Sequence, residues 1–484
     1  MISPESSDFT RVFDADLKAA GIPKTDAQGR TLDIHCQERV APAMHGRASR
    51  SQEHCDRTAG IHATNWKYYV HAMAHPMWRS LQGELGQNML GRNTTMRISI
   101  ICLAMASVVY GQRVPPVPQT RPAGATLRRA AGEKLLVGTA VMSFDLRKPG
   151  LAPLIAEQFG CLTAGNEMKP DALQRVKGRF TFERPDRMVA FAEEHDMQVI
   201  GHTLCWHQQT PKWMFQDDNG RPLPRDVALA NLKTHIETVV KHFKGKVKGW
   251  DVVNEAVNDG PQPYLRDTPA RRAIGDDFVL KAFEFAHQAD PNVELYYNDY
   301  NIELDYKRDR ALRLIRQIKA AGLRIDGVGI QGHWMLGSPS VAEIERGIRA
   351  YTAEGLKVMI TEMDIDVLPR RRRGGADLNA TERQGLNPYR AGLPDDVQEK
   401  LAQRYGDLFG LFMRYPQITR VTLWGTSDGD TWLNNFPVRG RTNHPMLFDR
   451  RLRLKPAFHA VIKALQSAKP DNGGTSTPNR TRSQ

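Results

Sequence analysis

Between residues 127 and 468, short apolar runs alternate with longer segments of helical period. The runs typical of strands are 135–141, 161–167, 198–205, 247–254, 293–299, 325–333, 357–363 and 419–425. The segments typical of helices are 151–159, 185–196, 226–244, 276–289, 306–321, 340–354, 394–414 and 455–466. Eight strands that each precede a helix, within about 340 residues, predict one α/β domain with the (β/α)₈ TIM-barrel fold. An open doubly wound sheet also alternates, but it usually has a glycine-rich phosphate turn after its first strand, and none follows 135–141.

The segments that flank 127–468 have the composition of a leader, a linker and a tail. From Met96 the chain reads MRISIICLAMASVVYGQ, a basic start followed by an apolar run, which predicts a signal peptide at 96–111. The apolar run is too short for an ordinary transmembrane helix. Residues 112–126 are rich in proline and small residues, as linkers are, and the polar segment 469–484 is expected to be a disordered tail.

Residues 1–95 precede the predicted signal, although an export signal works only at the start of a chain. They show no sustained period of 3.6 or 2 residues, so we expect little stable structure there. We expect translation to begin at Met96 or Met89, with 1–95 added by an over-extended gene start. The alternative is a genuine extension followed by a buried apolar segment. The first interpretation predicts a secreted or periplasmic protein with no stable membrane anchor.

The formal net charge of +13 makes nucleic acid a partner to consider. No stripe of lysine and arginine with interleaved aromatic residues occurs, and the densest cluster, Arg370 to Arg373, is typical of a solvated loop. The five cysteines form no CxxC pair, and the doubled pairs His35-Cys36 and His54-Cys55 have no further ligand spacing. We expect neither a nucleic-acid partner nor a metal site.

Polar and aromatic side chains gather where seven of the predicted strands end. They are Asn166, Glu167, Lys169, His202, Trp206, His207, Asn254, Glu255, Asn298, Asp299, Tyr300, Asn301, Gln331, His333, Trp334, Glu362, Asp364, Trp424, Asp428, Asp430 and Trp432. One such residue could be a satisfied core polar group, but the same bias at one end of seven strands indicates a site. In a TIM barrel, the active site lies at the carboxyl ends of the strands.

The residue types at these strand ends suit a carbohydrate. Acids and amides bond hydroxyl groups, and indoles cover the apolar faces of pyranose rings. No nucleophile elbow of the GxSxG type and no HExxH helix is present, so neither acyl transfer nor a catalytic metal is indicated. Glycoside hydrolysis needs two carboxyl groups, and Glu255 and Glu362 lie on roughly opposite strands of the ring. Their separation, which decides between retention and inversion, cannot be read from the sequence.

Each candidate also has a purely structural interpretation. Glu255 could favour a helix N-terminus, and Glu362 could pair with a cation within the barrel layers. His202 and His333 could be buried structural histidines. The carboxylates of Asp428 and Asp430 could order their own loop.

Six segments together resemble glycoside hydrolase family 10, the endo-β-1,4-xylanases: GHTLCWHQQTPKW, WDVVNEA, YNDYN, GIQGHW, ITEMDI and WGTSDGDTWLNNFPVRGR. The resemblance covers about 130–467 in the family's order. It implies a retaining double displacement, with Glu255 as acid/base and Glu362 as nucleophile.

The resemblance also implies substrate-binding roles. Asn254 would hold the 2-hydroxyl at the cleaved bond, and His333, with Asp364 behind it, would orient Glu362. Asn166 would bind one sugar further out, Trp432 would cover the subsite from above, and Tyr300 would stand on the far side of the cleft. The residues lining the subsite before the cleaved bond would be Lys169, His202, Trp206, Gln331 and Trp424.

One position departs from the family pattern. Gly165 stands where the family usually has a glutamate that bonds a substrate hydroxyl. We therefore hypothesise that the subsite two sugars back binds more weakly or accepts a decorated unit. Cys161 and Cys205 fall on neighbouring strands; two separate buried thiols are expected, and a disulfide is the alternative.

Three functions remain open to test. The leading one is endo-hydrolysis of xylan or xylo-oligosaccharides by a monomeric enzyme that needs no cofactor. A β-1,4-glucanase or mixed β-glycosidase would use the same barrel and the same carboxylates on another sugar. A non-catalytic carbohydrate-binding barrel would be expected if either glutamate were replaced, but both are present.

Overall fold

A computed structural model describes residues 125–369, 387–437 and 439–467. The segment 1–95, the predicted signal 96–111, most of the predicted linker, the Arg370–Arg373 cluster, both His-Cys pairs and the tail 469–484 lie outside the described residues. Thr126, the last residue of that linker, accepts a hydrogen bond from the backbone of Arg129 and caps the short helix α4 (Leu127–Ala131).

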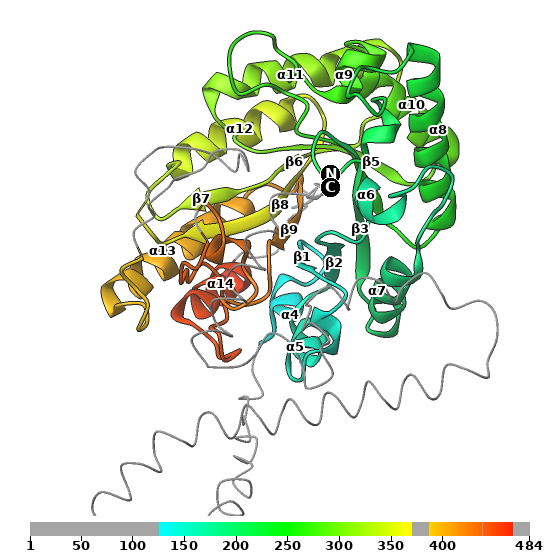
Figure 1. Ribbon diagram of the computed structural model, residues 1–484. Helices are drawn as coiled ribbons and strands as arrows, with labels where there is room; N and C mark the ends of the chain where they lie inside the picture. The colour runs from blue at the N-terminus through cyan, green and yellow to red at the C-terminus, as the bar shows by residue number, and fades with distance from the viewer. Residues whose placement is uncertain (1–124, 370–386, 438, 468–484) are drawn as a thin grey trace, which may run out of the picture. The chain divides into compact units, whose positions relative to one another are not determined.

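Eight parallel strands form a closed barrel, as predicted (Figure 1). Neighbouring strands pair in the order β1 (Leu136–Val141), β2 (Cys161–Ala164), β3 (Gln198–Trp206), β4 (Gly249–Asn254), β5 (Glu294–Asp299), β6 (Gly327–Ile330), β8 (Lys357–Asp366) and β9 (Ile418–Leu423). The ring closes because Leu136 of β1 lies opposite Arg420 of β9. The predicted strands match these bounds closely, since buried parallel strands are short, nearly continuous apolar runs.

The predicted strand 325–333 is in fact two elements. Gly332 has a φ of 82°, and this turn separates β6 from β7 (His333–Met335), which pairs with β8 alone. A Cβ at Gly332 would also stand 2.8 Å from Ile360 Cγ2. The break turns the chain at the barrel mouth, between Gln331 and His333.

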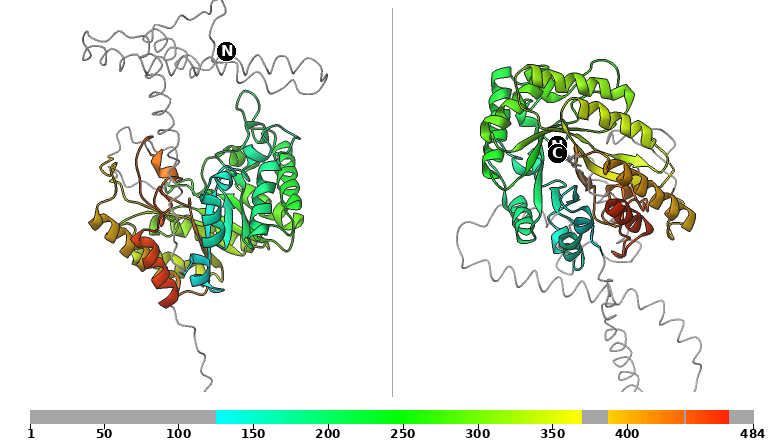
Figure 2. Two further views of the ribbon diagram at one scale, coloured as in Figure 1. Left: turned by 90° about the horizontal axis from the view of Figure 1, so that it is seen from below. Right: turned by 180° about the vertical axis from the view of Figure 1, so that it is seen from behind.

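Eight longer helices follow the barrel strands and cover the outside of the ring (Figures 1 and 2). They are α5 (Leu151–Gln158), α7 (Glu183–Glu194), α8 (Arg225–His242), α10 (Phe278–Ala289), α11 (Asp305–Ala320), α12 (Val341–Ala353), α13 (Asp395–Phe412) and α14 (Pro456–Ser467). Shorter elements in the loops escaped prediction, namely α6 (Pro170–Leu173), α9 (Pro269–Ile274) and the 3₁₀ turns Asp145–Arg147, Lys212–Met214 and Trp432–Asn434. In the described ranges, none of the helices combines the length and the apolar character needed to span a bilayer.

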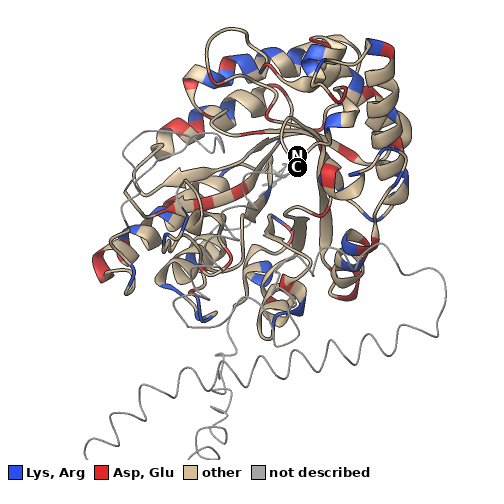
Figure 3. Ribbon diagram, in the orientation of Figure 1, with Lys and Arg blue, Asp and Glu red and all other residues tan. Residues whose placement is uncertain are grey.

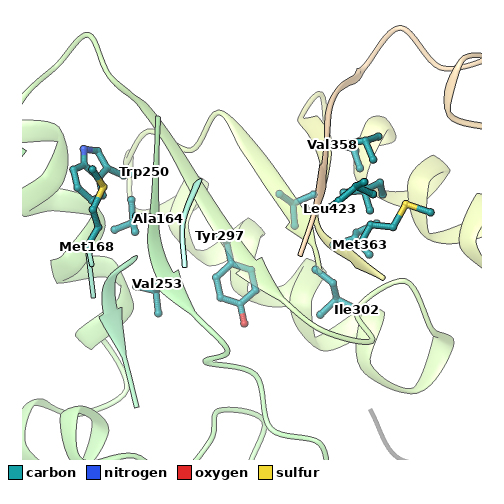
Figure 4. Packing of buried hydrophobic residues seen from close by; sticks show 14 of the residues in the cluster. Ala164, Met168, Trp250, Val253, Tyr297, Ile302, Val358, Met363 and Leu423 are labelled. Atoms are coloured by element: carbon teal, nitrogen blue, oxygen red, sulfur yellow. The ribbon is translucent and has the colours of Figure 1, made fainter. Parts of the chain in front are cut away.

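At two places where a barrel strand has a glycine, a large side chain of the neighbouring strand occupies the space beside it. A Cβ at Gly201 of β3 would stand 2.1 Å from Trp250 Cε3, and a Cβ at Gly249 would stand 2.4 Å from the ring of Tyr296. Figure 4 labels Trp250 and Met168 among the residues of the packed core. Lys and Arg lie mainly on the outer helices, interspersed with Asp and Glu, while β1, β2, β3 and β6 carry none of these four residue types (Figure 3).

Cys161 and Cys205 are both buried and form no disulfide, as expected. Cys161 lies opposite Gln198 at the start of β3, whereas Cys205 lies opposite Val253 near the end of β4. The two thiols are therefore at different heights of the barrel. Burial raises the pKa of Cys161 to about 11 and that of Cys205 to about 12, so both remain protonated at neutral pH.

Candidate active site

The two glutamates stand at the carboxyl ends of β4 and β8, and both are almost fully buried. Glu255 directly follows β4 with a φ of 58°, and its backbone N–H donates to the carbonyl of Asn298 at 2.9 Å. Glu362 lies within β8, and its backbone N–H donates to the carbonyl of Gln331 at 2.8 Å. The left-handed backbone conformation of Glu255 is uncommon outside glycine, and the hydrogen bond at the strand end holds it in place.

Glu255 is placed by neutral donors. Trp206 Nε1 donates to its Oε2 at 2.9 Å, and Gln331 Nε2 donates to its Oε1 at 2.9 Å. Burial, helped by the negative charge of Asp299, raises the pKa of Glu255 to about 7 because these hydrogen bonds only partly offset desolvation. His207 Nδ1 lies 4.0 Å away, but burial lowers the pKa of His207 to about 3, so it brings no positive charge.

Glu362 is placed by a cation instead. His333 Nε2 lies 3.2 Å from its Oε2, and Asn298 Nδ2 donates to its Oε1 at 2.8 Å. Burial opposes ionisation of Glu362, but the His333 hydrogen bond and the charges of His202 and His333 outweigh it and lower the pKa. The second carboxylate thus stays ionised under conditions in which the first is protonated.

His333 is held in its charged form from the other side. Its Nδ1 lies 3.0 Å from Asp364 Oδ2, which also accepts from Trp432 Nε1 at 2.7 Å. Although burial opposes it, the paired carboxylates of Asp364 and Glu362 raise the pKa of His333 to about 10. The protonated ring therefore donates to both carboxylates, and Trp432 is fixed 4.9 Å from it, between ring centroids.

A chain of side-chain amides connects the two glutamates. Gln331 Nε2 donates to Glu255 and, at 3.3 Å, to Asn254 Oδ1. Asn298 Nδ2 donates to the same Asn254 oxygen at 2.9 Å and to Glu362. Thr361 Oγ1 donates to Asn298 Oδ1 at 2.6 Å, which fixes the orientation of that amide. The carboxylates are consequently set relative to each other through neutral groups, without a direct bond.

A second polar group follows β2 and β3. Lys169 Nζ donates to Asn166 Oδ1 at 2.9 Å and to Gln209 Oε1 at 2.8 Å, and lies 4.8 Å from the ring centroid of Trp206. Burial lowers the pKa of Lys169 to about 8 despite the nearby Glu362 and Glu255. These donors and acceptors border the Glu255 side chain through Trp206.

His202 and Trp424 contact each other and lie near His333. His202 Nδ1 lies 2.9 Å from Asp251 Oδ2 inside the barrel, and its ring meets that of Trp424 edge-on, 5.4 Å between centroids. Trp424 also lies 6.5 Å from His333, so its indole stands beside both imidazoles.

The comparisons with known proteins agree on one family. The sequence model of glycosyl hydrolase family 10 matches residues 126–464. The chain is 41% identical to endo-1,4-β-xylanase A of Xylanibacter ruminicola, over 72% of this chain and 95% of that protein, and 39% identical to an endo-1,4-β-xylanase of Geobacillus stearothermophilus, over 70% and 98%. A solved GH10 endoxylanase from a sugarcane soil metagenome superposes with a TM-score of 0.67 at 39% identity, covering 70% of this chain and 99% of that one.

The chain belongs to glycosyl hydrolase family 10.

In this family 10 barrel, the predicted site residues lie close together. Tyr300 is the residue whose surroundings differ from the prediction. Tyr300 is buried, its hydroxyl donates to Asp259 Oδ2 at 2.5 Å, and Lys307 Nζ lies 3.7 Å from its ring centroid. Arg266 donates to the same hydroxyl at 2.8 Å and to the Glu255 carbonyl at 3.2 Å. Tyr300 therefore belongs to an ion-pair network next to Glu255, in which the Asp259 side chain remains partly exposed.

The structure gives direct contacts in the site to residues for which the sequence analysis assigned no role. Asn298 and Gln209 hydrogen-bond directly to predicted site residues, and Asp251 and Thr361 orient others. Asn298 follows the same strand-end pattern as the selected residues, and Gln209 stands in the WHQQ segment, so both had a usable signal. Asp251 and Thr361 lie within strands, where only the fold shows which side chains they meet.

Asp428 and Asp430 prove to order their own loop. The Asp428 carboxylate accepts from Lys455 Nζ at 2.9 Å and from the backbone of Met446 at 2.9 Å. Asp430 accepts from Ser427 Oγ at 2.7 Å and from Lys148 Nζ at 2.9 Å. Within the described residues, no group of three or more His, Cys, Asp or Glu side chains is arranged to hold a metal ion.

Proposed function

We propose that this family 10 protein is an endo-1,4-β-xylanase that cleaves xylan by retaining double displacement, with Glu255 as acid/base and Glu362 as nucleophile. One observation carries the assignment: the surroundings raise the pKa of Glu255 to about 7 and lower that of Glu362. Carboxyl groups whose pKa values are driven apart in this way take the acid and the nucleophile roles. The relatives named endo-1,4-β-xylanases support xylan as the substrate.

The first step uses both glutamates at once. A Glu362 oxygen bonds to the anomeric carbon while the glycosidic bond breaks, and the Glu255 proton passes to the leaving oxygen. The hydrogen bond from protonated His333 keeps the electron pair of Glu362 available in a buried site. Asn254, whose amide oxygen is already held by Asn298 and Gln331, can turn its remaining N–H groups to a sugar hydroxyl.

The second step reverses the roles. Esterified Glu362 carries no charge, and its negative charge is among the groups that raise the pKa of Glu255. The pKa of Glu255 consequently falls, and its carboxylate accepts a proton from water. The water oxygen bonds to the anomeric carbon as the ester bond breaks, which restores the original anomeric configuration.

The direct test is reducing-sugar release from glucuronoxylan by the full chain and by Glu362→Ala. We expect release to fall by several orders of magnitude in Glu362→Ala, and to be unaffected in Glu399→Ala, an exposed glutamate of α13. Proton NMR of the first products should show the β-anomer. Xylan binding without release by folded wild type would favour the carbohydrate-binding alternative, and preferential release from carboxymethyl cellulose would favour a glucanase.

The structure identifies a residue, Met142, that bears on the hypothesis of a weaker outer subsite at Gly165. A Cβ at Gly165 would stand 2.9 Å from Met142 Cε, so the Met142 thioether fills the space next to this glycine. We propose that Met142 makes this wall apolar and weakens binding of the second sugar. Gly165→Glu combined with Met142→Ala should raise kcat/KM on xylotriose relative to xylobiose by several-fold. Unchanged relative efficiencies would dismiss the hypothesis.

We further propose that the enzyme acts as a secreted or periplasmic monomer without a cofactor. The leader-like segment 96–111 supports export, and both carboxylates with all their partners come from one chain. Because water is the only co-substrate, treatment with a chelator should leave xylan hydrolysis unchanged.

A further inference from the structure

Two exposed aromatic rings stand at opposite points of the barrel mouth. Phe144, which follows β1, is 50% exposed, and Tyr306, in the first turn of the helix after β5, is 53% exposed. β1 and β5 are separated by three strands in either direction around the ring, so the two loops face each other across it. The other large apolar residues exposed in the described ranges, Val176 and Leu454, are aliphatic and have no flat ring face.

Phe144 is attached to the loops that follow β2 and β9. The backbone of its neighbour Ser143 donates to Glu167 Oε1 at 2.5 Å, next to Asn166. Lys148 Nζ lies 5.0 Å from the Phe144 ring centroid and pairs with Asp430, in the loop that leads to Trp432. β1 also neighbours β9, which adjoins β8 and its nucleophile.

Tyr306 is attached to the Glu255 side. Its hydroxyl accepts from Asn301 Nδ2 at 2.9 Å, and its carbonyl accepts from Arg310 Nη2 at 2.7 Å. The next residue, Lys307, is completely buried between Asp259 and Asp299. Tyr306 is therefore held at its hydroxyl and at its backbone, while about half of its surface is exposed.

We propose that Phe144 and Tyr306 are stacking platforms for distal sugar rings at the two ends of the substrate cleft. A half-exposed aromatic ring that is held in place offers an apolar face, which matches the C–H face of a pyranose ring and loses little conformational entropy on binding. Lone exposed apolar residues are ordinary on protein surfaces, but rings anchored on opposite barrel loops with the carboxylate pair between them form a line that a polysaccharide can follow.

The platforms serve different ends of the substrate, an assignment that rests on the proposed function. Glu255 protonates the leaving oxygen, so sugars near Tyr306 belong to the leaving part. Sugars near Phe144 belong to the part that stays on Glu362. Loss of either ring should therefore change where an oligosaccharide sits in the cleft, in opposite directions.

The test compares cleavage of xylohexaose labelled at its reducing end by wild type, Phe144→Ala and Tyr306→Ala. We expect each variant to lose about threefold to tenfold in kcat/KM, the size of one aromatic stacking contact. The labelled products should become longer in Phe144→Ala and shorter in Tyr306→Ala, because each chain shifts toward the remaining platform. Val176→Ala, a control on another exposed loop, should match wild type.

Conservative variants separate stacking from structure. Phe144→Tyr and Tyr306→Phe keep a flat ring and should retain the wild-type product pattern, whereas Phe144→Leu keeps apolar bulk and should behave like Phe144→Ala. An unchanged pattern in both alanine variants, or a wild-type pattern in Phe144→Leu, overturns the platforms. Failure of the wild type to cleave xylohexaose would instead overturn the proposed function.

Discussion

Glu255 and Glu362 have the same side chain, and only their neighbours give them different chemistry. Neutral donors from Trp206 and Gln331 surround the first, whereas the second faces protonated His333. Because desolvation acts on both, the hydrogen bond from His333 and the charges of His333 and His202 decide which carboxylate is ionised. Two predictions follow from this contrast.

The first concerns the pH dependence of stability. The pKa of Glu255 is about 7 in the folded protein against an ordinary value of 4.5, so its contribution is fully present below pH 4.5 and is lost as pH rises through 7. Glu255→Gln cannot ionise, so its free energy of unfolding relative to wild type should improve by about 3 kcal/mol between pH 4 and pH 8. Urea unfolding at both pH values measures this. Glu399→Gln is the exposed control, and an equal difference at both pH values would contradict the raised pKa.

The second concerns the pH dependence of activity. His333→Asn removes the strongest group that lowers the pKa of Glu362, so the acidic limb of kcat/KM should move to higher pH. The alkaline limb near pH 7, which reports Glu255, should stay in place. Full pH–rate profiles on xylan provide the readout. A uniform loss of activity with no movement of the acidic limb would mean that His333 is merely structural.

At the scale of elements, most of the barrel was predictable because each strand and helix has a local signature. The prediction failed where the chain turns at a single residue, as at Gly332. It also failed where an element is too short to show a period, as in α6 and β7. Contacts between elements are harder to predict from the sequence than the elements themselves. Gly347 of α12 is an example, since a Cβ there would stand 2.6 Å from the Cα of Glu303.

This close approach predicts an inverted effect of alanine. Alanine normally stabilises a helix interior by about 1 kcal/mol relative to glycine. Gly347→Ala should nevertheless lower the free energy of unfolding by about 1–3 kcal/mol, because the backbone of Glu303 cannot move easily. The matched control is Gly410→Ala in α13, where nothing lies within 4 Å and a gain of about 0.5–1 kcal/mol is expected. Urea midpoints compare the two, and a stable Gly347→Ala would show that α12 is less tightly packed.

At the scale of the whole molecule, the predicted signal peptide 96–111 makes a prediction about the first residue of the mature protein. The predicted cleavage after Gly111 gives a mature protein that starts at Gln112. Mass spectrometry of the native protein from culture medium or periplasm should find this terminus. Peptides from residues 1–88 in that sample would favour a genuine N-terminal extension.

Local sequence signals predicted the barrel correctly and also pointed to the carboxyl ends of its strands and to Glu255 and Glu362 as the candidate carboxylate pair. These follow from signals that each lie within about ten residues: apolar runs, helical period and polar strand ends. Three features required the tertiary structure: which glutamate is ionised, how the amide chain joins the two, and which exposed aromatic residues follow strands on opposite sides of the ring. The reason is distance along the chain. Asn298 reaches Glu362 across 64 positions and Gln331 reaches Glu255 across 76, and pKa values depend on such contacts rather than on local pattern.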